Sequence, residues 1–383
     1  MRDRRSKTRT RLLDTDRNVL FTRTRRGGDY LLLLRENTLM RQRFDVDRLA
    51  LAGEPEPIAE QVGSQGALGL FAVSPQVLAY RNGRSVTGGI NNQLTWLDRA
   101  GQPAGRLGDP GPYESAFISP DFTHVATTFM AIENRDVVTF DIERGLPVRF
   151  TSGPEIESNP VWSPDGQQIV FRSGSGGQIG FRRRRSDGSE RDEELLVSPE
   201  QKFATAWHGD FLLYQVTDSN TKDDIWLLPL TGDRNPVEVL RTPFNEANAS
   251  IAPDGRWIAY SSDETGRLEV YARAFERTSS GEVRLGAKIP VSKDGGTAPR
   301  WRRDGKELLF TGEGQAVMSV DVTTSPALRL SLAKQLFALP PGVFQWDLSG
   351  DGTRFLAAVP VPTDMDASSP ITVVMNWDAA LPE

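Results

Sequence analysis

Several aspartates in this chain stand in the same local setting, and their carboxylates could do chemistry. In "NPVWSPDGQQIVFRSG" (Asn159–Gly174), Asp165 follows a proline, precedes a glycine and separates two apolar runs. Such a carboxylate could serve as a general acid or base, or could bind calcium. The same residues in the same order also make a hairpin turn, because proline presets φ, aspartate accepts local N–H groups and glycine takes a positive φ. That turn is complete without a ligand. We therefore interpret the five aspartates at this position of the repeated turn as turn residues, although Asp121 lacks the following glycine: Asp121, Asp165, Asp254, Asp304 and Asp351.

Other groups that could catalyse a reaction are few. The chain has two histidines, His124 and His208, which lie in separate parts of the sequence, and it has no cysteine. Disulfides and thiolate chemistry are thereby excluded. The nucleophile-elbow, P-loop, dinucleotide-binding and kinase signatures are absent, and so are EF-hand and zinc-ligand spacings. We predict no catalytic residue, no metal and no cofactor.

The composition fits a soluble globular protein. The 383 residues are 38% hydrophobic and 25% charged, and the formal net charge of −6 gives no electrostatic reason to bind nucleic acid. Two basic runs oppose this balance, and we interpret them as a disordered N-terminus (residues 1–10) and a solvated strand edge (Arg182–Arg185). The alternative is a patch for nucleic acid or an anionic surface. No apolar stretch reaches the roughly 18–20 residues that span a bilayer, and the start lacks the apolar core of a signal peptide. We expect a monomer without a membrane segment.

Fixed-period similarity organises the chain. The segments "FAVSPQVLAY", "AFISPDFTHVATTF", "PVWSPDGQQIVF" and "SIAPDGRWIAY" align on Pro75, Pro120, Pro164 and Pro253. "TAWHGDFLLY" aligns through Trp207, whereas "PRWRRDGKELLF" and "WDLSGDGTRFLA" align through their Asp-Gly pairs. The first two steps, from Pro75 to Pro120 and from Pro120 to Pro164, are 45 and 44 residues. An eighth, weaker unit at the front begins with "NVLFTR" and lacks the turn.

Each copy is typical of four short strands, and a period in the mid-forties with such strands predicts a β-propeller. Propeller blades stack face to face, so inner strands such as "FLLY" and "ELLF" should be nearly continuous apolar runs. One column of the alignment is large and apolar in every copy. We assign it to the packing between blades: Val73, Ile118, Trp162, Trp207, Ile251, Trp301 and Leu348.

The loops that enter the innermost strands of a propeller ring one end of its channel, and polar groups there make a default ligand site. We predict a channel mouth formed by Glu114, Ser115, Glu157, Asn159, Lys202, Glu246, Asn248, Thr297 and Gln345. The alternative is that these residues only cap strand ends. Arg300 and Asp347 share one column in successive copies, where they could form a partly buried ion pair.

Longer segments resemble a known family. "VWSPDGQQIVF" and "APDGRWIAYSSDETGRLEVYARAF" resemble the repeats of TolB-like propellers. "GGTAPRWRRDGKELLF" and "SSPITVVMNWDAAL" are similar to the propeller that follows a Ser/Thr kinase in bacterial, acidobacterial-type receptor-like kinases. The resemblance runs from about Arg11 to the C-terminus. It implies a sensor or interaction part of a signalling protein, placed outside the cytoplasm, although nothing in this sequence would export it and no kinase domain is present.

These observations predict one all-β propeller over residues 11–383, with about eight four-stranded blades; seven blades, and then a six-bladed core with extra strands, are the alternatives. The expected repeats lie near residues 19–63, 64–110, 111–153, 154–199, 200–243, 244–294, 295–340 and 341–383. "RTRLLD" near the N-terminus could close the last blade, beside "TRFLAAV" and "ITVVMNW".

For function, the leading hypothesis is a non-catalytic module that binds a protein, peptide or glycan. The first alternative is an enzyme. It could be a hydrolase or lyase with channel carboxylates, or the propeller half of a prolyl-oligopeptidase-like peptidase. A detached gene fragment is the third possibility.

Overall fold

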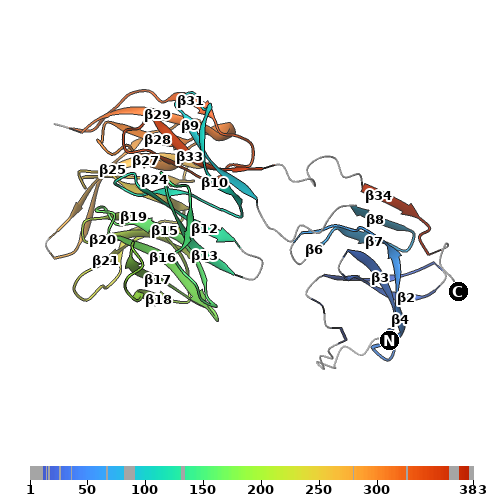
Figure 1. Cartoon of the computed structure of the whole chain (residues 1–383). Coiled ribbons are helices and arrows are strands. Elements are labelled where there is room, and N and C mark those ends of the chain that lie inside the picture. Colours follow the sequence, from blue (N-terminus) through green and yellow to red (C-terminus); the bar gives the residue numbers. More distant parts are fainter. Residues whose placement is uncertain are drawn as a thin grey trace. The chain divides into compact units, whose positions relative to one another are not determined.

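The computed structural model describes residues 12–13, 15, 18–25, 27–35, 37–65, 68–81, 91–130, 134–278, 280–324, 327–361 and 371–378. The basic segment 1–10 lies outside this part of the chain. The described residues form an all-β protein with one short 3₁₀ turn, η1 (Glu313–Gln315), and within these ranges there is no helix that could span a membrane. The chain divides into two compact units: unit 1 is Met1–Gly89 with Pro362–Glu383, and unit 2 is Ile90–Val361 (Figure 1).

Unit 2 has six antiparallel sheets in its described residues. Five of them follow one another along the chain. Their strands are β11 (Phe117–Ile118), β12 (His124–Met130), β13 (Arg135–Asp141) and β14 (Pro147–Arg149); β15 (Ile156–Trp162), β16 (Gln168–Ser175), β17 (Gln178–Arg185) and β18 (Glu193–Ser198); β19 (Gln201–His208), β20 (Phe211–Asp218), β21 (Lys222–Pro229) and β22 (Val237–Leu240); β23 (Glu246–Ile251), β24 (Trp257–Ser262), β25 (Glu269–Arg277) and β26 (Val283–Pro290); β27 (Thr297–Trp301), β28 (Glu307–Thr311), β29 (Ala316–Thr323), β30 (Arg329–Leu330) and β31 (Lys334–Ala338).

The sixth sheet, called the closing sheet below, joins the two ends of unit 2. Its order is β10 (Pro103–Gly111), β9 (Asn92–Asp98), β33 (Arg354–Pro360) and β32 (Trp346–Leu348). β9 pairs with β33 in one antiparallel register from Asn92 opposite Pro360 to Asp98 opposite Arg354. The start of the unit thus supplies the two outer strands and the end supplies the two inner strands, which removes open sheet edges at the seam.

Buried apolar side chains fill the space between successive sheets of unit 2. The second strands are nearly continuous apolar runs; all five residues of β28, "ELLFT", are buried. Such burial on both faces is expected where sheets are stacked. One cluster joins Val137 of β13 to Trp162 of β15. Further clusters join each following pair of sheets. The closing sheet packs through Phe355 against Leu309 of β28, and through Leu356 against Val125 of β12. The six sheets therefore form a closed ring, as in a β-propeller.

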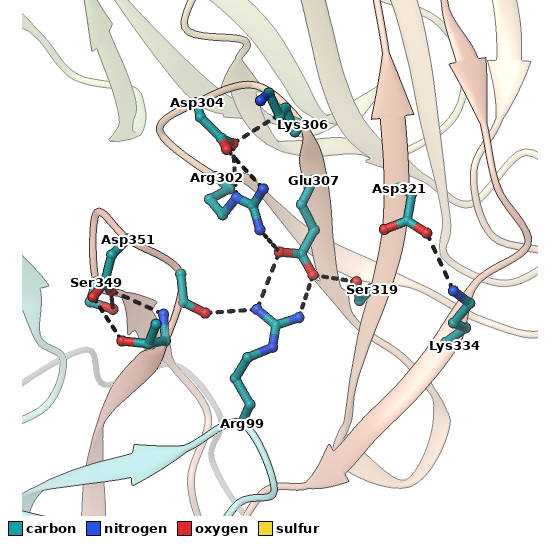
Figure 2. A network of polar contacts seen from close by, with 12 residues as sticks. Arg99, Arg302, Asp304, Lys306, Glu307, Ser319, Asp321, Lys334, Ser349 and Asp351 are labelled. Atoms are coloured by element: carbon teal, nitrogen blue, oxygen red, sulfur yellow. Dashed lines mark hydrogen bonds and ion pairs between the residues drawn. The ribbon is translucent and has the colours of Figure 1, made fainter.

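Polar contacts also hold the closing sheet (Figure 2). Arg99, in the turn between β9 and β10, donates to both carboxylate oxygens of Glu307 on β28, at 2.5 and 3.2 Å. It also donates to the Gly352 carbonyl oxygen at 2.7 Å. Glu307 is buried, and it accepts further hydrogen bonds from Arg302 at 2.9 Å and from Ser319 at 2.5 Å. Burial opposes ionisation, but the bonds from Arg99 and Ser319 still hold the pKa of Glu307 below its ordinary value.

Unit 1 contains sheets that do not belong to the ring of unit 2. One has the order β1 (Val19–Arg23), β2 (Asp29–Arg35), β3 (Thr38–Asp45) and β4 (Ala50–Ala59). Another has the order β34 (Ile371–Met375), β8 (Val77–Arg81) and β7 (Phe71–Val73), and β5 (Ser64–Gln65) pairs with β6 (Leu68–Gly69). The first two sheets share an apolar cluster that includes Leu32, Phe71 and Trp377.

The strand pairing differs from the expected eight consecutive repeats. "QLTWLD" (β9) and "TRFLAAV" (β33) were assigned to separate repeats, 64–110 and 341–383, but they pair with each other. "ITVVMNW" forms β34 and pairs with β8 in unit 1 instead of standing beside "TRFLAAV". β9 and β10 occupy the place expected for "RTRLLD", most of which lies outside the described residues. In the described residues, the pairing gives six sheets in unit 2 and separate sheets in unit 1.

Candidate functional site

The innermost strand of each sheet in unit 2, called its first strand below, lines the centre of the ring; in the closing sheet this strand is β32. Four of these strands are irregular. The register of β15, β19, β23 and β27 shifts against the following strand near the middle of the strand. Asn159, Asn248 and Ala298 at these positions take the left-handed conformation, with φ of 53°, 55° and 51°. Asparagine tolerates this region better than most residues, so its presence at two of the three positions is expected. Such β-bulges turn the backbone locally and aim side chains in new directions.

Each of these three backbone N–H groups donates to a side chain of the preceding sheet. Asn159 N donates to Thr128 Oγ1 at 3.1 Å, and Asn248 N donates to Gln215 Oε1 at 3.1 Å. Ala298 N donates to Ser261 Oγ at 3.2 Å. The Asn159 side chain also donates to the Ala204 carbonyl oxygen of the next sheet at 2.8 Å. The irregular positions therefore tie neighbouring sheets together around the centre.

A cavity of about 570 Å³ lies among these first strands. This volume lies within the usual range of small-molecule and cofactor sites. Its wall includes residues of β11, β15, β19, β23, β27 and β32, so it occupies the channel of unit 2. The polar and aromatic side chains that line it include Phe117, Asn159, Phe203, Trp207, Gln215, Asn248, Arg300, Trp301, Arg303, Gln345 and Asp347, together with four hydroxyl side chains, Ser119, Thr205, Ser250 and Ser349.

One ion pair stands in the channel wall. Arg300 Nη1 lies 3.5 Å from Asp347 Oδ1, which confirms the pair predicted from the repeat columns. Asp347 also accepts the backbone N–H of Ile118, in the neighbouring sheet, at 2.8 Å and that of Leu348 at 2.9 Å. Burial raises the pKa of the Asp347 carboxyl, and Arg300 opposes that shift. The Arg300 guanidinium packs between the rings of Phe117 and Trp346, at 5.8 and 5.7 Å from their centroids.

Three of the predicted mouth residues line the cavity: Asn159, Asn248 and Gln345. Thr297 lies beside this set, because its Oγ1 contacts Asn248 Nδ2 and Ser261 Oγ, both at 3.3 Å. The other five do not line the cavity. Glu114 lies 3.9 Å from Arg135, and Ser115, Glu157, Lys202 and Glu246 are buried.

The buried charges among these five residues have local roles. Lys202 Nζ donates to three carbonyl oxygens, those of Ile179, Ser198 and Glu200, at 2.9, 3.0 and 2.8 Å. Burial lowers the pKa of Lys202. Burial likewise raises the pKa of Glu157 and of Glu246. Glu246 accepts from Thr242 Oγ1 at 2.5 Å, whereas Glu157 Oε2 has no hydrogen-bond partner in the described part of the chain.

The cavity extends toward the opposite ends of the first strands from the predicted mouth. Its lining continues from Asn159 and Asn248 to Pro120, Pro253, Arg303 and Gly350, in the turns that lead into the second strands. Sequence reasoning placed the site at the strand entries, because the loops that enter the innermost strands of a propeller ring one end of its channel and carry polar groups here. The only sequence signal for the other end was the repeated turn itself, which had been explained without a ligand.

The turn aspartates have their carboxylates directed at their own turns. Asp165 Oδ1 accepts the Gln167 N–H at 3.0 Å and the Ser163 hydroxyl at 2.6 Å. Asp121, Asp254, Asp304 and Asp351 each accept the N–H group two residues further on, at 3.0–3.1 Å. The glycines that follow four of them, Gly166, Gly255, Gly305 and Gly352, have φ of 70–73°. The described residues contain no cluster of three or more His, Cys, Asp and Glu side chains that could hold a metal.

The predicted packing column is distributed over the clusters between sheets. Trp162 is buried, and its Nε1 donates to the Phe117 carbonyl oxygen of the preceding sheet at 2.9 Å. The remaining members are partly buried, each against a different apolar cluster: Val73, Ile118, Trp207, Ile251, Trp301 and Leu348. All of these except Val73 also line the cavity.

The basic run Arg182–Arg185 is fully paired. Its arginines lie 2.5, 2.6, 2.5 and 3.5 Å from Glu155, Glu193, Asp192 and Asp187, in that order. His124 and His208 lie in different sheets. His124 contacts Thr123, and His208 packs against Phe211, where burial lowers its pKa.

Comparison with solved structures shows that the fold is that of a β-propeller, and TolB-like propeller proteins are among the structural neighbours. A candidate TolB protein of Agrobacterium tumefaciens superposes with a TM-score of 0.54 over 72% of this chain and 100% of that chain, at 14% identity. TolB of Acinetobacter baumannii gives 0.45 over 90% and 81% at 13% identity, and a gluconolactonase of Xanthomonas campestris gives 0.45 over 70% and 95% at 14%. Identities this low show the fold alone.

Among curated sequences, an uncharacterized protein of Agrobacterium fabrum is 30% identical over 165 residues, which are 42% of this chain and 53% of that protein. The chain therefore spans about half the length of the curated relative it matches. No protein-family profile matches the sequence.

Proposed function

We propose that this protein is a non-catalytic binding module whose ligand enters the channel of unit 2. The observation that carries the proposal is the channel wall. First strands from all six sheets meet there around a cavity of about 570 Å³, and they present amides, aromatic rings and charged groups to it. Concave, partly apolar sites with a few converging polar groups are the usual form of a ligand site.

The lining argues for binding over hydrolysis. Among the described residues that line the cavity, Asp347 supplies the one carboxylate, and no histidine contributes. Glycoside hydrolysis needs two carboxyl groups about 5–9.5 Å apart on either side of the bond. Asp347 is in addition engaged by Arg300 and by two backbone N–H groups. Its position fits a structural role that leaves the amides and aromatic rings to contact a ligand.

The resemblance of "PRWRRDGKELLF" and "ITVVMNW" to kinase-associated propellers supports a finer proposal. On that basis the module is the sensing or interaction part of a signalling system, and the ligand is a protein, a peptide or a glycan. We take a peptide as the first choice, because Asn and Gln side chains can pair with both the N–H and the C=O of a peptide backbone.

The absence of native cysteine allows a direct test, because a single introduced thiol can be modified selectively. Gln345 is exposed at the cavity, so Gln345→Cys labelled with a fluorescein maleimide would place a bulky group in the channel. Leu332, 85% exposed, lies outside the cavity and provides the matched control, Leu332→Cys with the same label. A random heptapeptide library and a glycan array serve as probes.

We expect peptides selected on the wild type to bind unlabelled Gln345→Cys and to lose binding after labelling. The labelled control should bind them as before. If labelled Gln345→Cys retains full binding, the channel is not the site and the proposal fails.

A further inference from the structure

The turn between β27 and β28 carries two adjacent arginines in very different environments. Arg302 is saturated, because it donates to both oxygens of Asp304 at 2.8 Å and to Glu307 at 2.9 Å. Arg303 lies in the cavity wall, and its side chain makes no ion pair or hydrogen bond with any described residue. The Arg302 guanidinium is therefore engaged in the contacts beside the closing sheet. The Arg303 guanidinium remains free to bind a ligand in the cavity.

Arg300 adds a second set of donors to the same wall. Its guanidinium is held by the rings of Phe117 and Trp346 and by one 3.5 Å contact with Asp347. A guanidinium has five N–H donors, so one long ion pair leaves most of them unused. The side chain is therefore positioned in advance, at little further entropic cost to a ligand that reaches it.

The position of Arg303 is favourable for an incoming ligand. Its side chain lies against Gly350 in the neighbouring turn. A Cβ added to Gly350 would lie 3.4 Å from Arg303 Cδ and 3.6 Å from Arg303 Nη1. Pro120, Pro253 and Gly350 line the same end of the cavity, which is the end that reaches the turns. A ligand entering from this end would meet Arg303 first and Arg300 further along β27.

We infer that the channel binds a peptide through a carboxylate, which Arg303 and Arg300 hold while Trp301, Trp207 and Phe203 contact the neighbouring apolar part. This inference rests on the proposed function and adds the chemical class of the ligand. The charges that line the cavity favour a ligand with a single carboxylate, because two arginines and one aspartate leave one positive charge to be neutralised. A phosphate dianion would be repelled more strongly by Asp347. A nucleic acid would meet the net charge of −6 of the whole chain.

The test uses a heptapeptide selected from the random library on the wild-type protein, resynthesised with Glu or Asp replaced by Gln or Asn. A second form has its C-terminal carboxylate amidated. The protein variants are Arg303→Gln, Arg300→Gln and, as a matched control, Arg284→Gln. Arg284 is 66% exposed, and within the described part of the chain its guanidinium pairs with the equally exposed Glu282. Arg303→Gln removes no hydrogen bond or ion pair within the described residues, so its fold should be intact even if Arg300→Gln loosens the wall.

We expect the selected peptides to be enriched in acidic residues or to depend on a free C-terminus. Neutralising that carboxylate should weaken binding about tenfold or more, and Arg303→Gln should weaken it to a similar extent. The two changes together should cost little more than either alone, and Arg284→Gln should leave Kd unchanged. The amidated form separates a C-terminal carboxylate from a side-chain one.

Two results would overturn the inference while leaving the proposed function in place. In the first, peptides lose binding on the channel-labelled protein but tolerate both neutralisation of their carboxylates and Arg303→Gln. In the second, inorganic phosphate at millimolar concentration displaces the peptide whereas acetate does not, which would assign the arginines to phosphate.

Discussion

Arg300 and Asp347 stand 3.5 Å apart on the first strands of neighbouring sheets, and the carboxylate of Asp347 also accepts the Ile118 N–H of the next sheet. Three sheets therefore meet at one aspartate in the channel wall. This arrangement gives the pair two roles: it closes the ring locally, and it fixes the arginine that faces the cavity.

Arg300→Gln should lower the free energy of unfolding by about 1–3 kcal/mol. This is less than the 3–5 kcal/mol typical of a fully buried pair, because both side chains are partly exposed, at 26% and 19%. Asp347→Asn in the same background should recover part of the loss, since the unpaired charge is then removed. Chemical denaturation of the four proteins of this double-mutant cycle measures the coupling. Strictly additive effects of the two substitutions would show that there is no coupling energy between Arg300 and Asp347.

Glu307→Ala should be among the most destabilising changes in unit 2. It leaves Arg99, Arg302 and Ser319 without their shared acceptor, and breaking such a buried network costs about 3–5 kcal/mol. Asp321→Ala is the matched control, because its pair with Lys334 at 3.3 Å is 69% exposed on both sides (Figure 2). The control should change stability by less than about 1 kcal/mol. Thermal and urea unfolding of both variants measure the two losses of stability. Equal losses would contradict a stabilising role of the Glu307 network at the closing sheet.

Trp162→Ala should cost about 3–5 kcal/mol, because it opens a cavity between two sheets and also removes the hydrogen bond to the Phe117 carbonyl oxygen. Trp162→Phe keeps most of the packing and loses the hydrogen bond, so we expect a smaller loss, mainly the roughly 1 kcal/mol of that bond. An unchanged unfolding midpoint in the alanine variant would remove Trp162 from the packing between sheets.

Glu157 should make stability fall as the pH rises. Burial raises its pKa in the folded state above the unfolded value, so folding takes up a proton between the two values. The favourable contribution is complete below the ordinary carboxyl pKa and is lost as the pH passes through the raised one. Glu157→Gln should flatten this part of the stability curve, whereas Glu143→Gln, at an exposed position, should not. Urea unfolding from pH 4 to 8 gives the comparison, and parallel curves for wild type and Glu157→Gln would contradict the burial argument.

The sequence was informative where a signal is local. The Asp-Gly turns, two of which begin with proline, have strong conformational preferences, and Gly166, Gly255, Gly305 and Gly352 adopt the positive φ that those preferences require. The Arg300–Asp347 pair could be predicted as well, because equal columns of neighbouring repeats lie side by side in a propeller.

The sequence was less informative where the outcome depends on pairing between distant segments. "QLTWLD" and "TRFLAAV" both have the composition of inner strands, and nothing in either segment shows that they pair across about 260 residues. The position of the cavity also depends on side-chain volumes all around the ring. Glu157, Lys202 and Glu246 are buried within their sheets and do not line the cavity, whereas Arg303, which was not predicted, does.

The most direct test of the channel as a ligand site is to map where a bound peptide lies. A selected heptapeptide carrying p-benzoylphenylalanine can be photocrosslinked to the protein, and the modified residues can be identified by mass spectrometry. We predict crosslinks on β19, β23, β27 and β32, at residues such as Trp207 and Trp301, and their loss when excess unmodified peptide competes. Crosslinks confined to outer strands such as β18 or β26, or to unit 1, would contradict a ligand site in the channel.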